Sequence, residues 1–234
     1  MKVTVLHLLE GARAARGLAV VIDVFRAFTV APLALGRGVA RLHVVATVDE
    51  ALALKRSHPE WLLAGEREGR PAPGFDLPNS PAAFAAAELS GRTVVLRTSS
   101  GVQGLLAATG ADEVVAASFA NAAAVVDYVL RARPDEVSLV CMGWSGRAVT
   151  GDDVACAEYL AAGLGGAFPD FGPFRERLRA DPSGAKFFDP ALPWFPAEDF
   201  DLCARASWLE VVPRLDRSGP VASLSPAPAL GISG

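Results

Sequence analysis

The chain has 234 residues, of which 51% are hydrophobic and 21% charged, and its formal net charge is −4. This length suits one large α/β domain or two small ones, and an acidic chain without a basic stripe is not expected to bind nucleic acid. Three widely spaced cysteines in apolar surroundings predict reduced, buried thiols in a cytoplasmic protein, rather than a disulfide framework or a zinc site.

The apolar run 18–35 contains a predicted buried strand, Val20–Ile22. The N-terminal residues before this run do not resemble a signal peptide, and the charges of Asp23 and Arg26 argue against a membrane-spanning helix, so no membrane partner is expected. Because Asp23 and Arg26 follow the strand, they are expected where open α/β sheets bind ligands. An acid and a guanidinium suit a metal and an oxyanion there, and a structural ion pair is an equally good interpretation.

Residues 20–54 and 92–126 follow one pattern: strand, turn, helix, strand and the start of a second helix. Few identities are shared, so a duplication and a common supersecondary pattern both remain open. Either interpretation predicts two similar βαβα units in one mixed, largely parallel sheet. We expect helices on both faces, which makes a three-layer α/β/α fold.

Between these units, residues 64–81 form a Gly- and Pro-rich excursion, and such long irregular loops are usually functional. A third βα unit is predicted at 137–164. The pattern weakens after Pro169, with a last strand expected at 209–212. Residues 217–234 are rich in Ser, Pro, Ala and Gly, which predicts a disordered tail and leaves a single domain over residues 1–216.

Hydroxyl groups gather where the strand of the second unit meets its helix. Thr98, Ser99 and Ser100 precede Gly101, and hydroxyls with free amides at a helix N-terminus suit an anion. Simple capping of the helix is the alternative. No Gly-Lys-Ser/Thr follows, so nucleoside triphosphates are disfavoured.

A serine hydrolase is excluded. The segment 143–146 reads Gly-Trp-Ser-Gly and lacks the Gly-x-Ser-x-Gly spacing, and all three histidines precede it. Acid–base chemistry is therefore expected from carboxylates or from water on a metal. Asp152 and Asp153 start the helix of the third unit, and with Asp23 and Glu66 they could form a Mg²⁺ site, helix capping being the alternative.

Further polar residues follow other predicted strands. Arg67 is either a ligand for an anion or a solvated surface charge, and Asn79 with Ser80 either binds a ligand or forms a turn. Ser118 and Asn121 follow the second strand of the second unit. They are interpreted first as a helix cap, with Asn121 as a candidate for the same crevice.

Taken in order, these segments resemble the 2-phosphosulfolactate phosphatase (ComB-type) family over about residues 3–214. The matching segments are Ile22–Ala27, Leu63–Arg67, Pro73–Asp76 with Asn79–Pro81, Thr98–Gly101, Ser118–Ala122, Asp152–Ala157, Asp199–Ala204 and Val212–Pro213. Each motif is modest, and their colinear series is specific.

The resemblance implies a Mg²⁺-dependent phosphatase that hydrolyses 2-phospho-3-sulfolactate to 3-sulfolactate and phosphate, a step of coenzyme M synthesis in methanogens. It implies catalytic roles for Asp23, Arg26 and Asp153, and Mg²⁺ held by Asp23, Asp152 and Asp153 directly or through water. The substrate-binding residues that it implies are Glu66, Arg67, Asn79, Ser80, Thr98, Ser99, Ser100, Gly101, Ser118 and Asn121. The expected partner is a small anionic phosphorylated substrate, a homodimer is left open, and covalent catalysis by Ser99 or Ser100 is an alternative to direct attack by water.

Four motifs depart from the family pattern. Ser99-Ser100-Gly101 stands where members usually have Thr-Asn-Gly, and Pro78 stands where they have Gly. Asp152 replaces a Glu, and Glu158 replaces a Gly. Two alternative functions follow: a phosphatase for another small phosphorylated hydroxy acid, and a non-catalytic binder of anionic metabolites.

Overall fold

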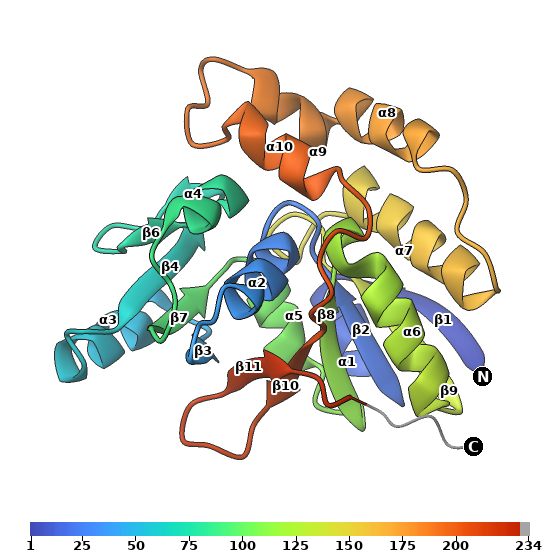
Figure 1. Cartoon of the computed structure of the whole chain (residues 1–234), viewed down its shortest axis with the longest axis horizontal. Helices are drawn as coiled ribbons and strands as arrows, with labels where there is room; N and C mark the ends of the chain where they lie inside the picture. The colour runs from blue at the N-terminus through green and yellow to red at the C-terminus, as the bar shows by residue number, and fades with distance from the viewer. Residues whose placement is uncertain (230–234) are drawn as a thin grey trace.

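The computed structural model describes residues 1–229, and one mixed sheet of eleven strands runs through the molecule (Figure 1). The sheet order is β1-β9-β2-β8-β10-β11-β3-β7-β4-β5, and β6 pairs with β4 beside this path. The strands are β1 (Lys2–His7), β2 (Leu18–Ile22), β3 (Arg41–Val44), β4 (Leu62–Arg67), β5 (Arg70–Pro71), β6 (Leu77–Pro78), β7 (Thr93–Arg97), β8 (Glu113–Ala117), β9 (Glu136–Cys141), β10 (Pro213–Asp216) and β11 (Ser223–Pro226).

Helices cover both faces of the sheet, as predicted for an α/β fold. They are α1 (Leu8–Ala14), α2 (Ala27–Gly36), α3 (Val48–Ser57), α4 (Pro81–Ala86), α5 (Gly101–Ala107), α6 (Ala122–Ala132), α7 (Gly151–Leu164), α8 (Gly172–Ala180), α9 (Pro182–Ala185) and α10 (Ala197–Cys203), with short 3₁₀ helices η1 (Phe119–Asn121) and η2 (Lys186–Phe188). Helices α6 and α7 share one apolar core with β2, β8 and β9, and α1, α2 and α5 share another.

The sheet consists of two parallel blocks joined by an antiparallel hairpin. Strands β1, β9, β2 and β8 are parallel to one another, and so are β3, β7 and β4. The hairpin β10–β11 joins the blocks, because β10 pairs with β8 and β11 pairs with β3, both antiparallel. The prediction of a mixed, largely parallel sheet is confirmed.

The repeated βαβα pattern occurs in both predicted places, but its two copies do not form separate halves. The first copy places β2 in one block and β3 in the other, and the second copy places β7 and β8 in the opposite order. Each copy therefore crosses the molecule once. Helices α2 and α5 make these crossings and lie at the centre of the molecule (Figure 1).

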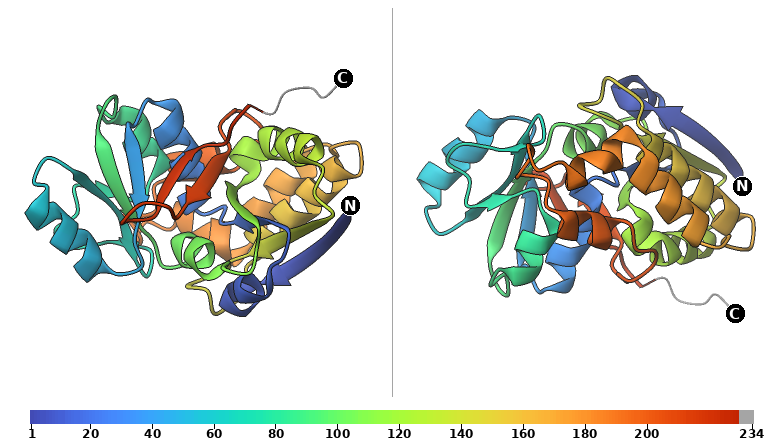
Figure 2. Two further views of the ribbon diagram at one scale, coloured as in Figure 1. Left: turned by 90° about the horizontal axis from the view of Figure 1, so that it is seen from below. Right: turned by 90° about the horizontal axis from the view of Figure 1, so that it is seen from above.

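Strand β2 is buried along its whole length, which explains its unbroken apolar sequence. The parallel strands β2 and β9 flank one another and end at the same edge, so the segments that follow them meet there. Helices α8 to α10 lie over this region, and residues 172–203 are called the cap below; Figure 2 shows the cap in front when the molecule is seen from above.

Three sequence-based expectations need correction. Residues 64–81 are not an irregular loop, since they contain β4, β5 and β6. The last strands are β10 and β11, not 209–212. The tail predicted as disordered from residue 217 carries β11, in which Leu224 is buried and pairs with Leu42 of β3; one buried leucine among Ser and Pro gave too weak a pattern. Residues 230–234 of that tail lie outside the described residues.

All three cysteines are buried and unpaired with one another, in agreement with the expected free thiols. Burial raises the pKa of each thiol, so none is activated as a nucleophile. In the described part of the chain, no helix combines the length and the apolar character that crossing a bilayer requires.

Candidate active site

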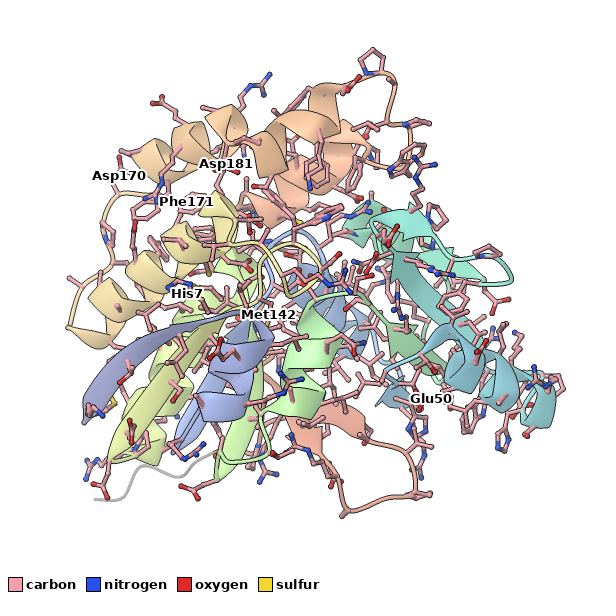
Figure 3. The ribbon with its side chains drawn as sticks, turned by 180° about the vertical axis from the view of Figure 1, so that it is seen from behind. His7, Glu50, Met142, Asp170, Phe171 and Asp181 are labelled. Atoms are coloured by element: carbon pink, nitrogen blue, oxygen red, sulfur yellow. The ribbon has the colours of Figure 1, made fainter. Side chains whose placement is uncertain are left out.

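A small pocket lies at the edge where β2, β4, β7 and β9 end, beneath the cap. Its lining combines acidic, hydroxyl and aromatic side chains: Asp23, Phe25, Arg26, Glu66, Gly69, Asn79, Ser99, Ser100, Gly143, Trp144, Ser145 and Phe195. Figure 3 shows this region from behind, with Met142 just after β9 and Asp181 in the cap. The ends of parallel strands are the expected place for a ligand.

Asp23 is held by two backbone amides at helix starts. Its Oδ2 accepts a hydrogen bond from Gly101 N at 2.7 Å, and its Oδ1 accepts one from Ala27 N at 3.2 Å. These bonds favour the carboxylate, but burial opposes it more strongly, and the charges of Asp152 and Glu66 add to the effect. The pKa of Asp23 is therefore raised to about 7.

Asp153 is tied to the loops on either side of the pocket. Its Oδ1 accepts from Val24 N at 2.9 Å and its Oδ2 from Gly143 N at 2.7 Å, so it joins the ends of β2 and β9. Burial raises its pKa well above the usual range, and the charges of Asp152 and Asp23 contribute. The Asp153 carboxylate therefore holds the backbone of the segments that follow β2 and β9, and it does not cap its own helix, α7.

Asp152 lies beside these two acids, and its Oδ1 is buried without a hydrogen-bond partner among the described residues. Burial raises its pKa, while the hydroxyls of Thr150 and Ser183 and the charge of Lys186 oppose the rise. An orphaned carboxylate oxygen near two mutually repelling acids is an arrangement that a cation would stabilise.

The carboxylates of this site suit Mg²⁺ because the ion needs few protein ligands. Within residues 1–229, no three His, Cys, Asp or Glu side chains are arranged as a ready-made metal cluster. Mg²⁺ needs only one or two carboxylates, since it keeps several waters and uses substrate phosphate. The free Oδ1 of Asp152 meets that requirement directly, whereas both oxygens of Asp23 and both oxygens of Asp153 already accept backbone hydrogen bonds.

Glu66 organises the hydroxyl side of the pocket. Its Oε2 accepts from Gly69 N at 2.6 Å and from Ser99 Oγ at 3.1 Å, and its Oε1 accepts from Ser99 N. Ser100 Oγ donates to Gly143 O at 2.7 Å. Thr98 lies behind this wall, where its hydroxyl accepts from Val102 N at 3.1 Å and caps the first turn of α5.

Arg26 pairs with Asp199 of the cap rather than with Asp23. Its Nη1 donates to Asp199 Oδ2 at 2.7 Å and to Trp194 O at 2.9 Å, and both charged side chains are almost fully buried. Asp199 Oδ1 accepts from Ser80 Oγ at 2.7 Å. Ser80 therefore joins the cap to the sheet and is not part of the pocket lining. The structural ion pair that the sequence left open is therefore present for Arg26, with Asp199 rather than Asp23 as its partner.

Asn79 and Arg67 have different environments. Asn79 lines the pocket, and its Oδ1 is buried without a hydrogen-bond partner in the described part of the chain, so it can accept from a ligand or a water. Arg67 is exposed at the end of β4, outside the pocket lining. Its side chain thus matches the surface-charge interpretation.

Ser118 and Asn121 form a capping box around η1, away from the pocket. Ser118 N donates to Asn121 Oδ1 at 3.0 Å, and Ser118 Oγ accepts from Ala120 N and donates to Phe28 O. The Asn121 amide donates to Ala116 O and Val211 O. These bonds match the helix-cap interpretation of both residues.

Sequence reasoning did not select Asp199, Lys186, Trp144 or Phe195 as site residues. Trp144 and Phe195 line the pocket, and Lys186 Nζ lies 4.1 Å from the centroid of the Trp144 ring. Three of the four lie in the cap, where the sequence has no clear periodicity. In the sequence, Asp199 stands out only as part of a short segment that resembles the family, and no sequence pattern relates it to Arg26.

The chain is similar in sequence to proteins named as probable phosphatases. Residues 4–179 match the 2-phosphosulpholactate phosphatase family. A probable 2-phosphosulfolactate phosphatase of Bacillus subtilis is 34% identical over 208 residues, covering 88% of this chain and 90% of that protein. One of Carboxydothermus hydrogenoformans is 33% identical over 228 residues, covering 91% and 92%. The chain therefore belongs to the 2-phosphosulpholactate phosphatase family, whose members are named as phosphoric monoester hydrolases.

Proposed function

We propose that the protein hydrolyses 2-phospho-3-sulfolactate to 3-sulfolactate and phosphate, with Mg²⁺ as cofactor. Family membership supports the substrate class. The observation that carries the chemistry is Asp23, a buried carboxyl at the end of β2 whose pKa is raised to about 7. A carboxyl that exchanges a proton near neutral pH is suited to acid–base catalysis.

Asp152 would hold the ion through its free Oδ1, Asp23 would contact it through water, and Asp153 would add charge while fixing the loops around it. Bound Mg²⁺ would neutralise charge on the transferring phosphoryl group. Ser99 and Ser100 line the pocket, and their hydroxyls would face the phosphoryl oxygens. Asn79, with its unpartnered Oδ1, can accept a hydrogen bond from the attacking water.

In the reaction, a water oxygen forms a bond to phosphorus and the bond from phosphorus to the ester oxygen breaks. Asp23 takes the proton that the water loses, and the leaving ester oxygen takes a proton from solvent water to become the hydroxyl of sulfolactate. Because Ser99 Oγ donates to Glu66 Oε2, Glu66 could instead accept the proton of a serine nucleophile. Trapping of a phosphoserine in rapidly quenched enzyme, absent in Ser99→Ala, distinguishes this covalent route.

The test is phosphate release from 2-phospho-3-sulfolactate with and without Mg²⁺, beside phospholactate and phosphoglycolate. Mg²⁺-dependent turnover fastest on the sulfonate supports the proposal. Turnover on another acid alone would replace the substrate, and no turnover on any would favour a non-catalytic binder. Asp23→Asn is expected to abolish turnover and to leave the melting temperature within a few degrees, because the amide oxygen still accepts the Gly101 hydrogen bond.

Another phosphorylated hydroxy acid is a second candidate substrate, since Ser100 stands at a lining position where the family pattern has Asn. A serine is shorter and leaves more room at this wall. Restoring the amide with Ser100→Asn should shift preference toward the sulfonate if that position selects the substrate. An unchanged ratio of kcat/KM values would show that it does not.

A further inference from the structure

The cations expected to bind the substrate are largely engaged by the protein itself. Arg26 pairs with Asp199, and Arg67 lies exposed outside the pocket. Arg97 donates to Glu66 O, Ser99 Oγ and Ala46 O. 2-Phospho-3-sulfolactate carries three anionic groups, a phosphoryl group, a sulfonate and a carboxylate, so its binding needs a further positive charge near the pocket.

Lys186 of η2 is a cation in a different situation. Its Nζ lies 4.1 Å from the Trp144 ring centroid and 5.0 Å from that of Phe195, and both rings line the pocket. Among residues 1–229, no carboxylate oxygen lies within the 4.0 Å salt-bridge distance of this ammonium. No carboxylate of the described residues therefore contacts this ammonium directly, while the buried acids Asp152 and Asp23 lie near enough for their charges to favour its protonated form.

The two rings beside Lys186 both form part of the pocket wall. A Cβ at Gly69 would lie 2.8 Å from Phe195 Cζ and 2.9 Å from a Trp144 ring atom, so the β4–β5 turn closes against both. Aromatic faces attract an ammonium group while excluding water from it. A partly desolvated cation interacts with an anion more strongly than one in bulk water.

We propose that Lys186 is a specificity-determining residue that binds the carboxylate of the substrate while the phosphoryl group lies at Asp23. This inference rests on the proposed function and deepens it. In this proposal, Arg26 and Asp199 hold the cap over the sheet, and Lys186 binds the acidic group by which the substrate is selected. Lys186 lies in the cap and Asp23 at the end of β2, so substrate choice can change in the cap without change at Asp23.

The test compares wild type with Lys186→Met, Lys186→Arg and Arg179→Met on two esters. Phospholactate carries the second acid, and isopropyl phosphate keeps the branched ester carbon without it. Lys186→Met should lose about 10- to 100-fold in kcat/KM on phospholactate, mostly through KM, because hydrogen bonds between charged groups are worth this much. On isopropyl phosphate the loss should be only a few-fold, and Lys186→Arg should restore most of the activity on phospholactate.

Arg179→Met is the matched control, since this exposed cap residue also stacks on an aromatic ring, Phe188, but outside the pocket. It should behave as wild type on both esters. Equal losses on both esters in Lys186→Met, or no loss on either, would overturn the proposal.

Failure of the proposed function has a separate signature. If wild type releases phosphate from no ester, binding of 3-sulfolactate is followed by isothermal titration calorimetry. Weaker binding in Lys186→Met, with Arg179→Met unchanged, then supports the role of Lys186 in a non-catalytic binder. No binding to wild type, or equal binding to wild type and Lys186→Met, contradicts it.

Discussion

Gly101 N donates to Asp23 Oδ2 at 2.7 Å, although 78 positions separate the two residues in the chain. The contact joins the start of α5 to the end of β2 and therefore links the two copies of the βαβα pattern. A Cβ at position 101 would lie 2.7 Å from that same oxygen and 2.8 Å from Phe28 Cζ. Only glycine allows the backbone to approach the carboxylate this closely.

Gly101→Ala should therefore displace Asp23 and lower stability by about 1–3 kcal/mol, the usual cost of overpacking. Turnover should fall at least as steeply as stability, because the displaced group is the proposed acid–base residue. Gly36→Ala is the control, since its Cβ would meet only Val211 at 3.7 Å, an ordinary contact. Urea unfolding and phosphate release measure both effects; a fully active Gly101→Ala enzyme would contradict the role given to this contact.

The raised pKa of Asp23 predicts how the metal-free protein responds to pH. Between about pH 4 and pH 7 the unfolded chain has released this proton while the folded chain retains it. The folded state then binds more protons, so the free energy of unfolding falls as pH rises, and Asp23 contributes no further loss above about pH 7. The pKa values of Asp152 and Asp153 are also raised, so these two residues likewise lower the free energy of unfolding as pH rises.

Asp23→Asn removes one part of this dependence. Relative to wild type, the variant should gain stability as the pH increases from about 4 to 7, which urea unfolding in EDTA measures directly. Asp49→Asn, at an exposed position in the first turn of α3, should follow the wild-type curve. Parallel curves for wild type and Asp23→Asn would mean that Asp23 ionises normally in the folded protein.

The cap is predicted to depend on the buried Arg26–Asp199 pair. Asp199→Asn leaves the guanidinium without its charged partner, so stability should fall by about 3–5 kcal/mol. Asp201→Asn is the matched control two residues further on, because its pair with Arg175 is exposed and should be worth at most about 1 kcal/mol. Urea unfolding compares them; equal losses would show that the buried pair does not stabilise the cap.

The parts of the site that follow strand ends could be predicted from the sequence. Asp23, Glu66 and Ser99 each come directly or closely after an apolar run, and parallel strands bring such positions to one edge. The buried run of β2 and the helix beginning at Asp152 were equally clear. Hydrophobic patterns locate the strands and therefore the residues at their ends, because such patterns involve only residues that are close together in the sequence.

The cap could not be predicted in this way. Arg26 meets Asp199 across 173 positions, and neither residue carries a local signal that names its partner. Lys186 acquires its place from the packing of two aromatic rings, which is a property of the folded chain only. β11 was missed for a related reason: it is held by pairing with β3 and β10, and its composition is that of a loop.

Magnesium binding can be tested without turnover. An ion that binds the folded state alone stabilises it by RT ln(1 + [L]/Kd), about 2.7 kcal/mol when its concentration is one hundred times Kd. Mg²⁺ added to EDTA-treated protein should therefore raise the melting temperature by several degrees. It should also reduce the dependence of stability on pH described above, since the ion offsets repulsion among the acids.

Asp152→Asn should lose most of this rise in melting temperature, because it removes the negative charge of the side chain whose Oδ1 lacks a partner in the described structure. Glu158→Gln, an exposed acid on the same helix, should keep the shift. If Mg²⁺ does not change the melting temperature of the wild type, the protein does not bind the ion. Lys186 and the backbone amides would then be the groups that neutralise the charge of the substrate.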